Sequence, residues 1–172
     1  MLLRGLVLLT AAVLLCGCET ARNGLDYSET VRKIGPPKAG QTRVVVFREK
    51  GYGGIGDSDW VFSLDGAPIK GLKTGTYVYV DRPAGQHQFV AEEAALGTTR
   101  VDFSAQSGQT VFFVTRMSER KSAMIANAST GLLGWGLTLA MTSGYKNQGP
   151  LDFLPLEEQA ARTTIAELKL AE

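Results

Sequence analysis

The residue types best suited to chemistry in this chain are a glycine-rich run, a pair of aspartates and a single histidine. Residues 51–56 read Gly-Tyr-Gly-Gly-Ile-Gly, which is the spacing of a dinucleotide-binding loop. Such a loop needs a helix to begin there, so that the first amides of the helix meet the pyrophosphate. Here Asp57 and Asp59 lead into another predicted strand, and two acids would repel phosphate. The pattern therefore favours a glycine-rich hairpin loop, and we expect no cofactor.

The same two aspartates could offer carboxylates to a divalent cation such as Ca²⁺. Calcium takes about six to eight oxygen ligands, and no further acids cluster in this segment, so solvated loop acids fit better. His87 lies between two glutamines on a predicted strand, with no second histidine to share a zinc ion. No G-x-S-x-G elbow accompanies it. We therefore expect His87 to be a half-exposed strand residue, and we expect neither a metal site nor catalytic residues.

Two further pairs could suggest a site. Glu92 and Glu93 are candidates for paired acids on a glycosidic bond, but adjacent strand residues point to opposite faces, so they cannot flank one bond. They are expected to be surface charge. Tyr77 and Tyr79 share one face of a predicted strand, where they could bind a ligand or simply pack. Packing is the default for aromatic residues on a sheet.

The elements that must position these residues are strands, because the hydrophobic pattern has a period of two. Asp65-Gly66 is a strong hairpin signal, and Pro83-Ala84-Gly85 predicts a second turn. Short strands spaced by about ten residues indicate a mainly β fold, a single antiparallel β-sandwich. Good helix formers after Pro155 predict a C-terminal helix over about 156–170. The strands are predicted at residues 42–48, 59–64, 76–80, 86–92, 98–104 and 109–115.

The first residues of the chain resemble a bacterial lipoprotein signal peptide. Arg4 precedes an uncharged apolar stretch that ends in Leu15-Cys16-Gly17-Cys18, a sequence similar to a lipobox. Residues 1–17 are thus predicted to be cleaved, leaving Cys18 as the lipidated N-terminus. The alternatives are an uncleaved anchor or an ordinary secretory cleavage. Glu19 favours the outer membrane, because Asp at that position marks inner-membrane retention in Gram-negative lipoproteins.

The mature chain is predicted to consist of a lipidated cysteine with a flexible tether over 18–41, then a single domain over 42–172. After removal of the signal and lipidation of Cys18, no cysteine is left for a disulfide, a nucleophile or a metal, so the core alone must hold the domain. Loss of Arg4 takes the 18 basic residues to 17, equal to the 17 acidic residues. This balance argues against nucleic acid as a partner.

One segment, residues 122–145, contains no charged side chain. It is long enough to span a membrane, but several glycines and polar residues dilute its hydrophobicity. It could instead be a loop or short helix folded onto the sandwich, an apolar surface that dips into a nearby leaflet, or a docking site for a partner.

Much of the mature chain resembles a domain-of-unknown-function family of small proteobacterial lipoproteins, itself similar to PEGA-type repeats. The matching pieces are residues 35–48, 64–66, 72–77, 83–87 and 153–161. The resemblance implies an immunoglobulin-like or prealbumin-like sandwich, and it brings no catalytic residues. The insert at 122–145 departs from the family pattern.

We therefore expect a non-enzymatic interaction or accessory module of the cell envelope, anchored by lipid to the outer membrane and facing the periplasm. Its expected contact features are Trp60, the loop over 51–59 and the insert. One alternative is a small-molecule or metal-binding periplasmic protein, possibly hydrolytic, with His87 as its base. Another is a subunit of an envelope assembly that docks through 122–145.

Overall fold

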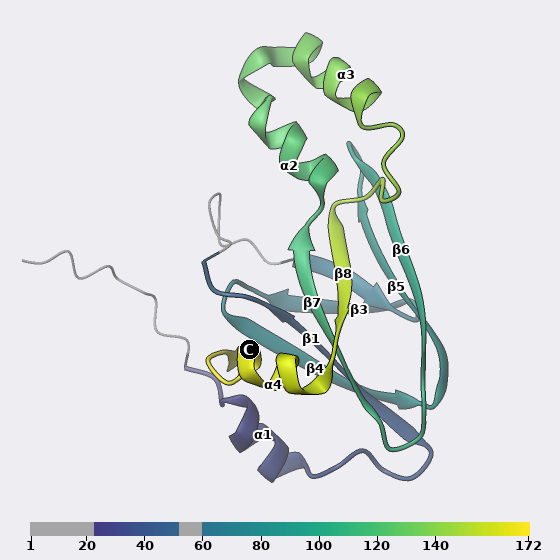
Figure 1. Ribbon diagram of the computed structural model, residues 1–172, viewed down its shortest axis with the longest axis vertical. Helices are drawn as coiled ribbons and strands as arrows, with labels where there is room; N and C mark the ends of the chain where they lie inside the picture. The colour runs from purple at the N-terminus through teal and green to yellow at the C-terminus, as the bar shows by residue number, and fades with distance from the viewer. Residues whose placement is uncertain (1–22, 52–59) are drawn as a thin grey trace, which may run out of the picture.

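The computed structural model describes residues 23–51 and 60–172 (Figure 1). The signal peptide, Cys18, the glycine-rich run after Gly51, Asp57 and Asp59 lie outside these residues, so the predictions on them stay predictions. The described elements are, in chain order, α1 (Tyr27–Ile34), β1 (Gln41–Arg48), β2 (Trp60–Leu64), β3 (Ala67–Leu72), β4 (Thr76–Pro83), β5 (Gly85–Glu93), β6 (Gly97–Ala105), β7 (Thr110–Met117), α2 (Glu119–Ala126), the 3₁₀ turn η1 (Ala128–Thr130), α3 (Gly131–Met141), β8 (Leu151–Leu156), α4 (Glu158–Ile165) and β9 (Lys169–Leu170).

The strands form two sheets, so the prediction of a mainly β chain is confirmed. One sheet has the order β8-β7-β1-β4-β9 and the other has the order β3-β2-β5-β6. Asp65 (φ 54°) and Gly66 (φ 78°) make the predicted tight turn between β2 and β3, where a left-handed backbone is needed. The Pro83–Gly85 turn carries the chain from β4 in the first sheet to β5 in the second.

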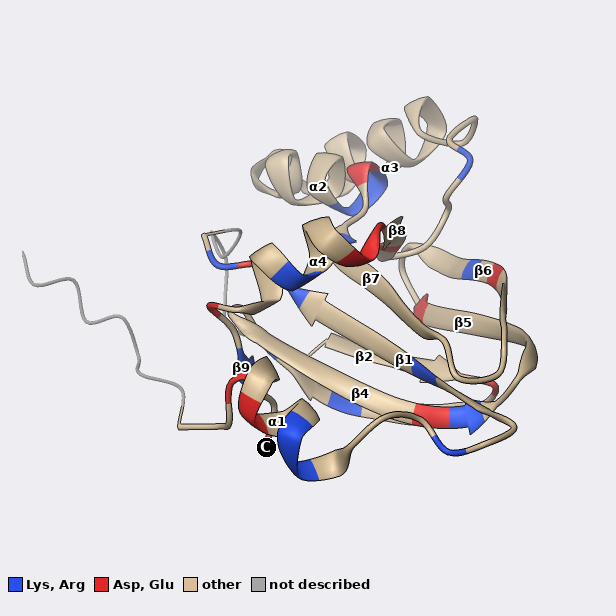
Figure 2. Cartoon of the chain, turned by 60° about the horizontal axis from the view of Figure 1, so that its bottom comes forward, with Lys and Arg blue, Asp and Glu red and all other residues tan. Residues whose placement is uncertain are grey.

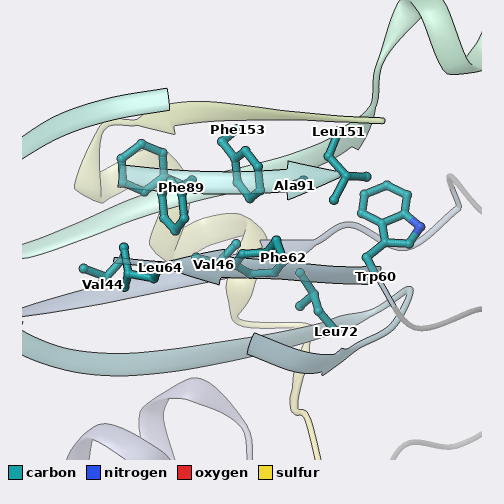
Figure 3. Packing of buried hydrophobic residues seen from close by; sticks show 11 residues of the cluster. Val44, Val46, Trp60, Phe62, Leu64, Leu72, Phe89, Ala91, Leu151 and Phe153 are labelled. Atoms are coloured by element: carbon teal, nitrogen blue, oxygen red, sulfur yellow. The ribbon is translucent and has the colours of Figure 1, made fainter. Parts of the chain in front are cut away.

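The main core lies between the two sheets. Phe89 from β5 is fully buried, with its ring stacked on Phe153 at 4.6 Å between centroids and edge-on to Phe62 and Phe113. Figure 3 shows side chains of both sheets meeting in this layer. The alternating burial of β2, buried at Trp60, Phe62 and Leu64, is the period-two pattern expected of a strand with one core face.

A second core covers the outer face of the five-stranded sheet. Helices α1 and α4 lie across that face (Figure 2), and Tyr27, Ile165 and Leu168 pack there against Phe47 and other sheet residues. Strand β1 is therefore buried on both faces, with Val44 to Phe47 all 3% exposed or less. An unbroken apolar run such as Val-Val-Val-Phe is the signature of a strand covered on both sides.

Three expectations need correction. The proposed flexible tether over 18–41 contains helix α1, because Asp26 and Glu29 form a capping box at its start and Tyr27 anchors it in the second core. The sheets are not purely antiparallel, since β1 pairs in parallel with β7 and β4 in parallel with β9. The C-terminal helix spans only Glu158–Ile165, since Leu156 belongs to β8 and residues 169–170 add the short strand β9.

Candidate functional site

The most distinctive surface feature is a helical hairpin made of α2, η1 and α3, which we call the α2–α3 hairpin (residues 119–141). It projects from one end of the long axis of the molecule, and α1 lies toward the other end (Figure 1). Apart from its first three residues, the hairpin is built from the segment that the sequence singled out as uncharged. The sequence left open a loop or short helix folded onto the sandwich. The segment instead forms most of a pair of short helices that stand away from the sheets.

Local side-chain bonds set where the two helices start and turn. Ser118 caps α2 by accepting a hydrogen bond from the Lys121 amide at 3.1 Å. Asn127 closes α2 by donating from Nδ2 to the Ala123 carbonyl, and Thr130 donates to the Asn127 carbonyl. Gly131 (φ 68°) then permits the left-handed corner at which α3 begins. These bonds turn the chain back on itself within a few residues.

Helix α3 has the reverse of the polarity expected of a helix in water. Its two threonines are buried, with Thr138 at 5% and Thr142, which caps its end, at 3% exposure. Four of its large apolar side chains are exposed, namely Leu132 (85%), Leu133 (91%), Leu137 (62%) and Met141 (73%), while Trp135 and Leu139 are half-buried. Contiguous exposed apolar side chains on a soluble domain mark a contact surface.

The base of the hairpin is fastened to the two-sheet body. Lys121 Nζ lies 2.5 Å from Glu93 Oε2 at the end of β5. Arg120 is 8% exposed and donates from Nη1 to the Thr142 carbonyl at the C-terminal end of α3. Ser118 Oγ also donates to the Gly149 carbonyl at 2.6 Å. The start of the hairpin is thus bonded to the body, and Arg120 ties the start of α2 to the end of α3.

None of the described helices combines the length and the apolar character needed to cross a membrane. Helix α3 has eleven residues, about 16 Å at a rise of 1.5 Å per residue.

The histidine lies in a different environment from the one expected. His87 is 6% exposed rather than half-exposed, and its Nδ1 lies 2.9 Å from Asp65 Oδ2. Asp65 reaches it because the β2–β5 pairing brings the β2–β3 turn beside His87, and the second carboxylate oxygen of Asp65 accepts the Gln88 amide. His87 packs on Phe103, and its Nε2 is covered and has no hydrogen bond among the described residues. This pair fastens a turn and presents no nitrogen to a substrate.

The paired residues weighed as possible sites make separate contacts. Glu92 lies 3.7 Å from Arg100 on the neighbouring strand, whereas Glu93 holds Lys121, so the two acids do not share a site. Tyr77 is fully buried and Tyr79 half-buried, and both pack in the second core. Within residues 23–51 and 60–172, no three histidine, cysteine, aspartate or glutamate residues gather as metal ligands.

Trp60, expected to be a contact feature, belongs to the core. It is 7% exposed, and the Arg48 guanidinium lies 3.9 Å from the centre of its ring. The expectation that Trp60 offers a surface for a partner is therefore wrong. The apolar pattern of β2 already indicates this, because Trp60, Phe62 and Leu64 share one face.

Comparison with protein-family models, with curated proteins and with solved structures gives no match to this chain. The resemblance to the small-lipoprotein family therefore stays a prediction from the residues.

The hairpin was visible in the sequence through its missing charges, but its orientation was not predicted. The signal that could have shown this is the position of its threonines. Thr138 and Thr142 are four residues apart, on one side of a helix, and Leu133 and Leu137 share another side. The partnership of Asp65 with His87 leaves no comparable sequence signal, because it depends on which strands become neighbours.

Proposed function

We propose that this chain is a non-enzymatic lipoprotein of the cell envelope. It is anchored through Cys18 to the outer membrane, faces the periplasm, and works as an interaction or accessory module. The observation that carries this proposal is the α2–α3 hairpin, an exposed projection that carries no charge beyond its base and is attached to a well-packed body. A group of apolar side chains that stays exposed on a folded domain is typical of a contact surface.

The position of the first described residues supports a lipid anchor close to the two-sheet body. The first described residues lie against the sheet: the Leu170 amide donates to the Leu25 carbonyl at 2.8 Å. Only a few residues separate Cys18 from this fixed point, and a chain spans at most about 3.5 Å per residue. A lipid on Cys18 would therefore hold the body next to the membrane surface.

We infer further that the two sheets form a sandwich of the immunoglobulin-like or prealbumin-like type. The two sheets face each other across a layer in which Phe62 and Phe89 of one sheet pack against Phe153 and Phe113 of the other, and this packing supports a sandwich. The parallel β1–β7 pair and the helices on the outer face are additions to a plain sandwich of that kind.

The competing function, a small-molecule or hydrolytic protein using His87, has weaker support. A general base must come within hydrogen-bond reach of the proton that it abstracts. Nδ1 of His87 is bonded to Asp65, and Nε2 is covered by protein atoms. The base would need the β2–β3 turn to open before it could act.

The test of the proposed location is separation of inner and outer membranes on a density gradient. Wild type should sediment with the outer membrane, while a large part of Cys18→Ser should leave it, because a single lost lipidation site removes every acyl chain. The matched control is Cys16→Ser, which alters the neighbouring cysteine but keeps Cys18. Wild type in the soluble fraction, or Cys18→Ser unchanged in the outer membrane, would contradict the proposal.

A further inference from the structure

We propose that the tip of the α2–α3 hairpin inserts into the acyl region of a phospholipid leaflet. This inference deepens the proposed function by naming the chemistry that the hairpin contacts, and it rests on the proposed membrane location. The reversed polarity of α3 supports it first. Leu132 and Leu133 are 85% and 91% exposed at the tip, while Thr138 and Thr142 are buried. A helix with its polar residues inside and its leucines outside suits an apolar medium.

Four hydroxyls in the hairpin and directly after it bond to nearby backbone carbonyls. Thr138 donates to the Gly134 carbonyl and Thr142 to the Thr138 carbonyl, each at 2.8 Å. Thr130 and Ser143 likewise donate to carbonyls three residues earlier. Hydroxyls that bond back to their own helix leave no donor to be stranded without water.

The distribution of charge also supports insertion of the tip into lipid. Figure 2 shows the hairpin without charged residues except at its base, and residues 122–145 contain none. The segment ends at Tyr145, which is 41% exposed, and at the exposed Lys146. A tyrosine and a lysine at the edge of an apolar segment are typical of the headgroup boundary, where the ammonium group meets lipid phosphate.

The dimensions fit one leaflet. Helix α3 is about 16 Å long, close to half of a hydrocarbon core of about 30 Å. The hairpin therefore matches a shallow insertion and not a crossing.

A second protein is a less suitable occupant than lipid. At about 100° per residue, the exposed side chains from Leu132 to Met141 cover roughly half of the circumference of α3. A helix that docks in a protein groove presents a narrower apolar stripe, with charged residues at the rim. Fluid acyl chains can surround such a tip from several sides.

The test uses the chain beginning at Glu19, without lipid, and vesicles of phosphatidylethanolamine and phosphatidylglycerol in a 3:1 ratio, roughly as in a bacterial membrane. Both cores and all described elements lie after Asn23, so this chain keeps what folds it. The chain has two tryptophans, Trp60 in the core and the half-buried Trp135 on α3. Vesicles whose acyl chains carry bromine should quench Trp135, and Trp135→Phe should abolish the quenching while the protein still floats with vesicles.

A charge at the tip should prevent insertion. Leu132→Asp with Leu133→Asp should lower the vesicle partition coefficient about 50-fold or more, because aspartate in an apolar helix strongly opposes insertion. The control is Val61→Asp, which places one such charge on a 55% exposed valine of the body and should bind as wild type does. Circular dichroism establishes that each variant is folded.

Three results would overturn the proposal: no flotation of the wild-type chain, unchanged partition of the tip variant, or a self-associated species that shields Trp135 without binding vesicles. Each is independent of lipidation, because the chain tested carries no lipid. A failure of the Cys18 anchor would instead show in the separation of inner and outer membranes.

Discussion

The hydroxyl of Tyr77 is the strongest single link between helix α1 and the sheet, and its removal gives a sharp test of the fold. It lies 2.5 Å from Thr30 Oγ1 and 3.0 Å from the Asp26 carbonyl oxygen, with the Leu25 carbonyl at 3.2 Å. Tyr77 and Thr30 are 0% and 1% exposed. Tyr77→Phe keeps the ring, and with it the edge-on contact to Tyr27. It leaves the buried Thr30 hydroxyl and the two backbone carbonyls without their hydrogen-bond partner.

The expected loss follows from what is left unpaired. A buried donor or acceptor that loses its partner costs about 1–3 kcal/mol, so Tyr77→Phe should lower the free energy of unfolding by about 2 kcal/mol. Urea unfolding followed by tryptophan emission measures this value. The matched control is Tyr79→Phe, because the hydroxyl of Tyr79 makes no hydrogen bond among the described residues, and that change should stay below about 0.5 kcal/mol. Equal losses in the two variants would refute the role given to Tyr77.

The same residue predicts a dependence on alkaline pH. Burial raises the pKa of Tyr77 to about 12 from its ordinary 10.0. Because the unfolded chain then loses its proton first, the stability from this group is complete below pH 10 and is lost as the pH rises toward 12. The loss amounts to at most about 3 kcal/mol. Burial also raises the pKa of Tyr27, so Tyr77→Phe should keep a weaker decline. An identical decline in wild type and variant would contradict this assignment.

Substitutions at Phe89, Asp65 and Gly149, two of them with control variants, test the packing by urea unfolding. Phe89→Ala removes a fully buried ring from the main core and should cost about 3–5 kcal/mol; a loss below about 1 kcal/mol would mean that the sheets do not meet there. Asp65→Ala removes the partner of His87 and strains a left-handed turn, so it should lower the free energy of unfolding by about 2 kcal/mol. Asp65→Asn should lower it clearly less, and equal losses would refute the role given to Asp65 in the turn. Gly149→Ala drives a Cβ into the Thr99 backbone amide of β6 and should destabilise, whereas Gly136→Ala meets nothing within 4 Å and should gain about 0.5–1 kcal/mol; a neutral Gly149→Ala would contradict the contact.

The strands were predictable because their information is local. Six predicted strands correspond to β1, β2 and β4 to β7 within about two residues at each end, except that β4 runs on to Pro83, and each has a period-two pattern or a β-branched run. The turn at Asp65-Gly66 was equally local, since only certain residues adopt its dihedral angles readily. Strand β3 was missed because Pro68, Lys70 and Gly71 interrupt its pattern.

The features that could not be predicted depend on which elements become neighbours. Residues 27–34 are polar in sequence and resemble a tether, yet the sheet face beneath Tyr27 makes them a helix. His87 alternates with glutamines, which indicates half-exposure, but Asp65 from the β2–β3 turn and Phe103 from β6 close over it. The candidate site was also only partly predictable. The absence of charge in 122–145 was visible in the sequence, whereas the outward orientation of the leucines became clear only from the burial of the threonines in the structure.

The central claim is that Cys18 holds this module on a membrane, and intact-mass analysis of the protein isolated from cells tests it most directly. Wild type should have the mass of a chain that begins at Cys18 and carries three acyl chains, and it should be found in the outer-membrane fraction. Cys18→Ser should lack those acyl chains. A wild-type chain that is unlipidated, or that retains residues 1–17, would contradict the account.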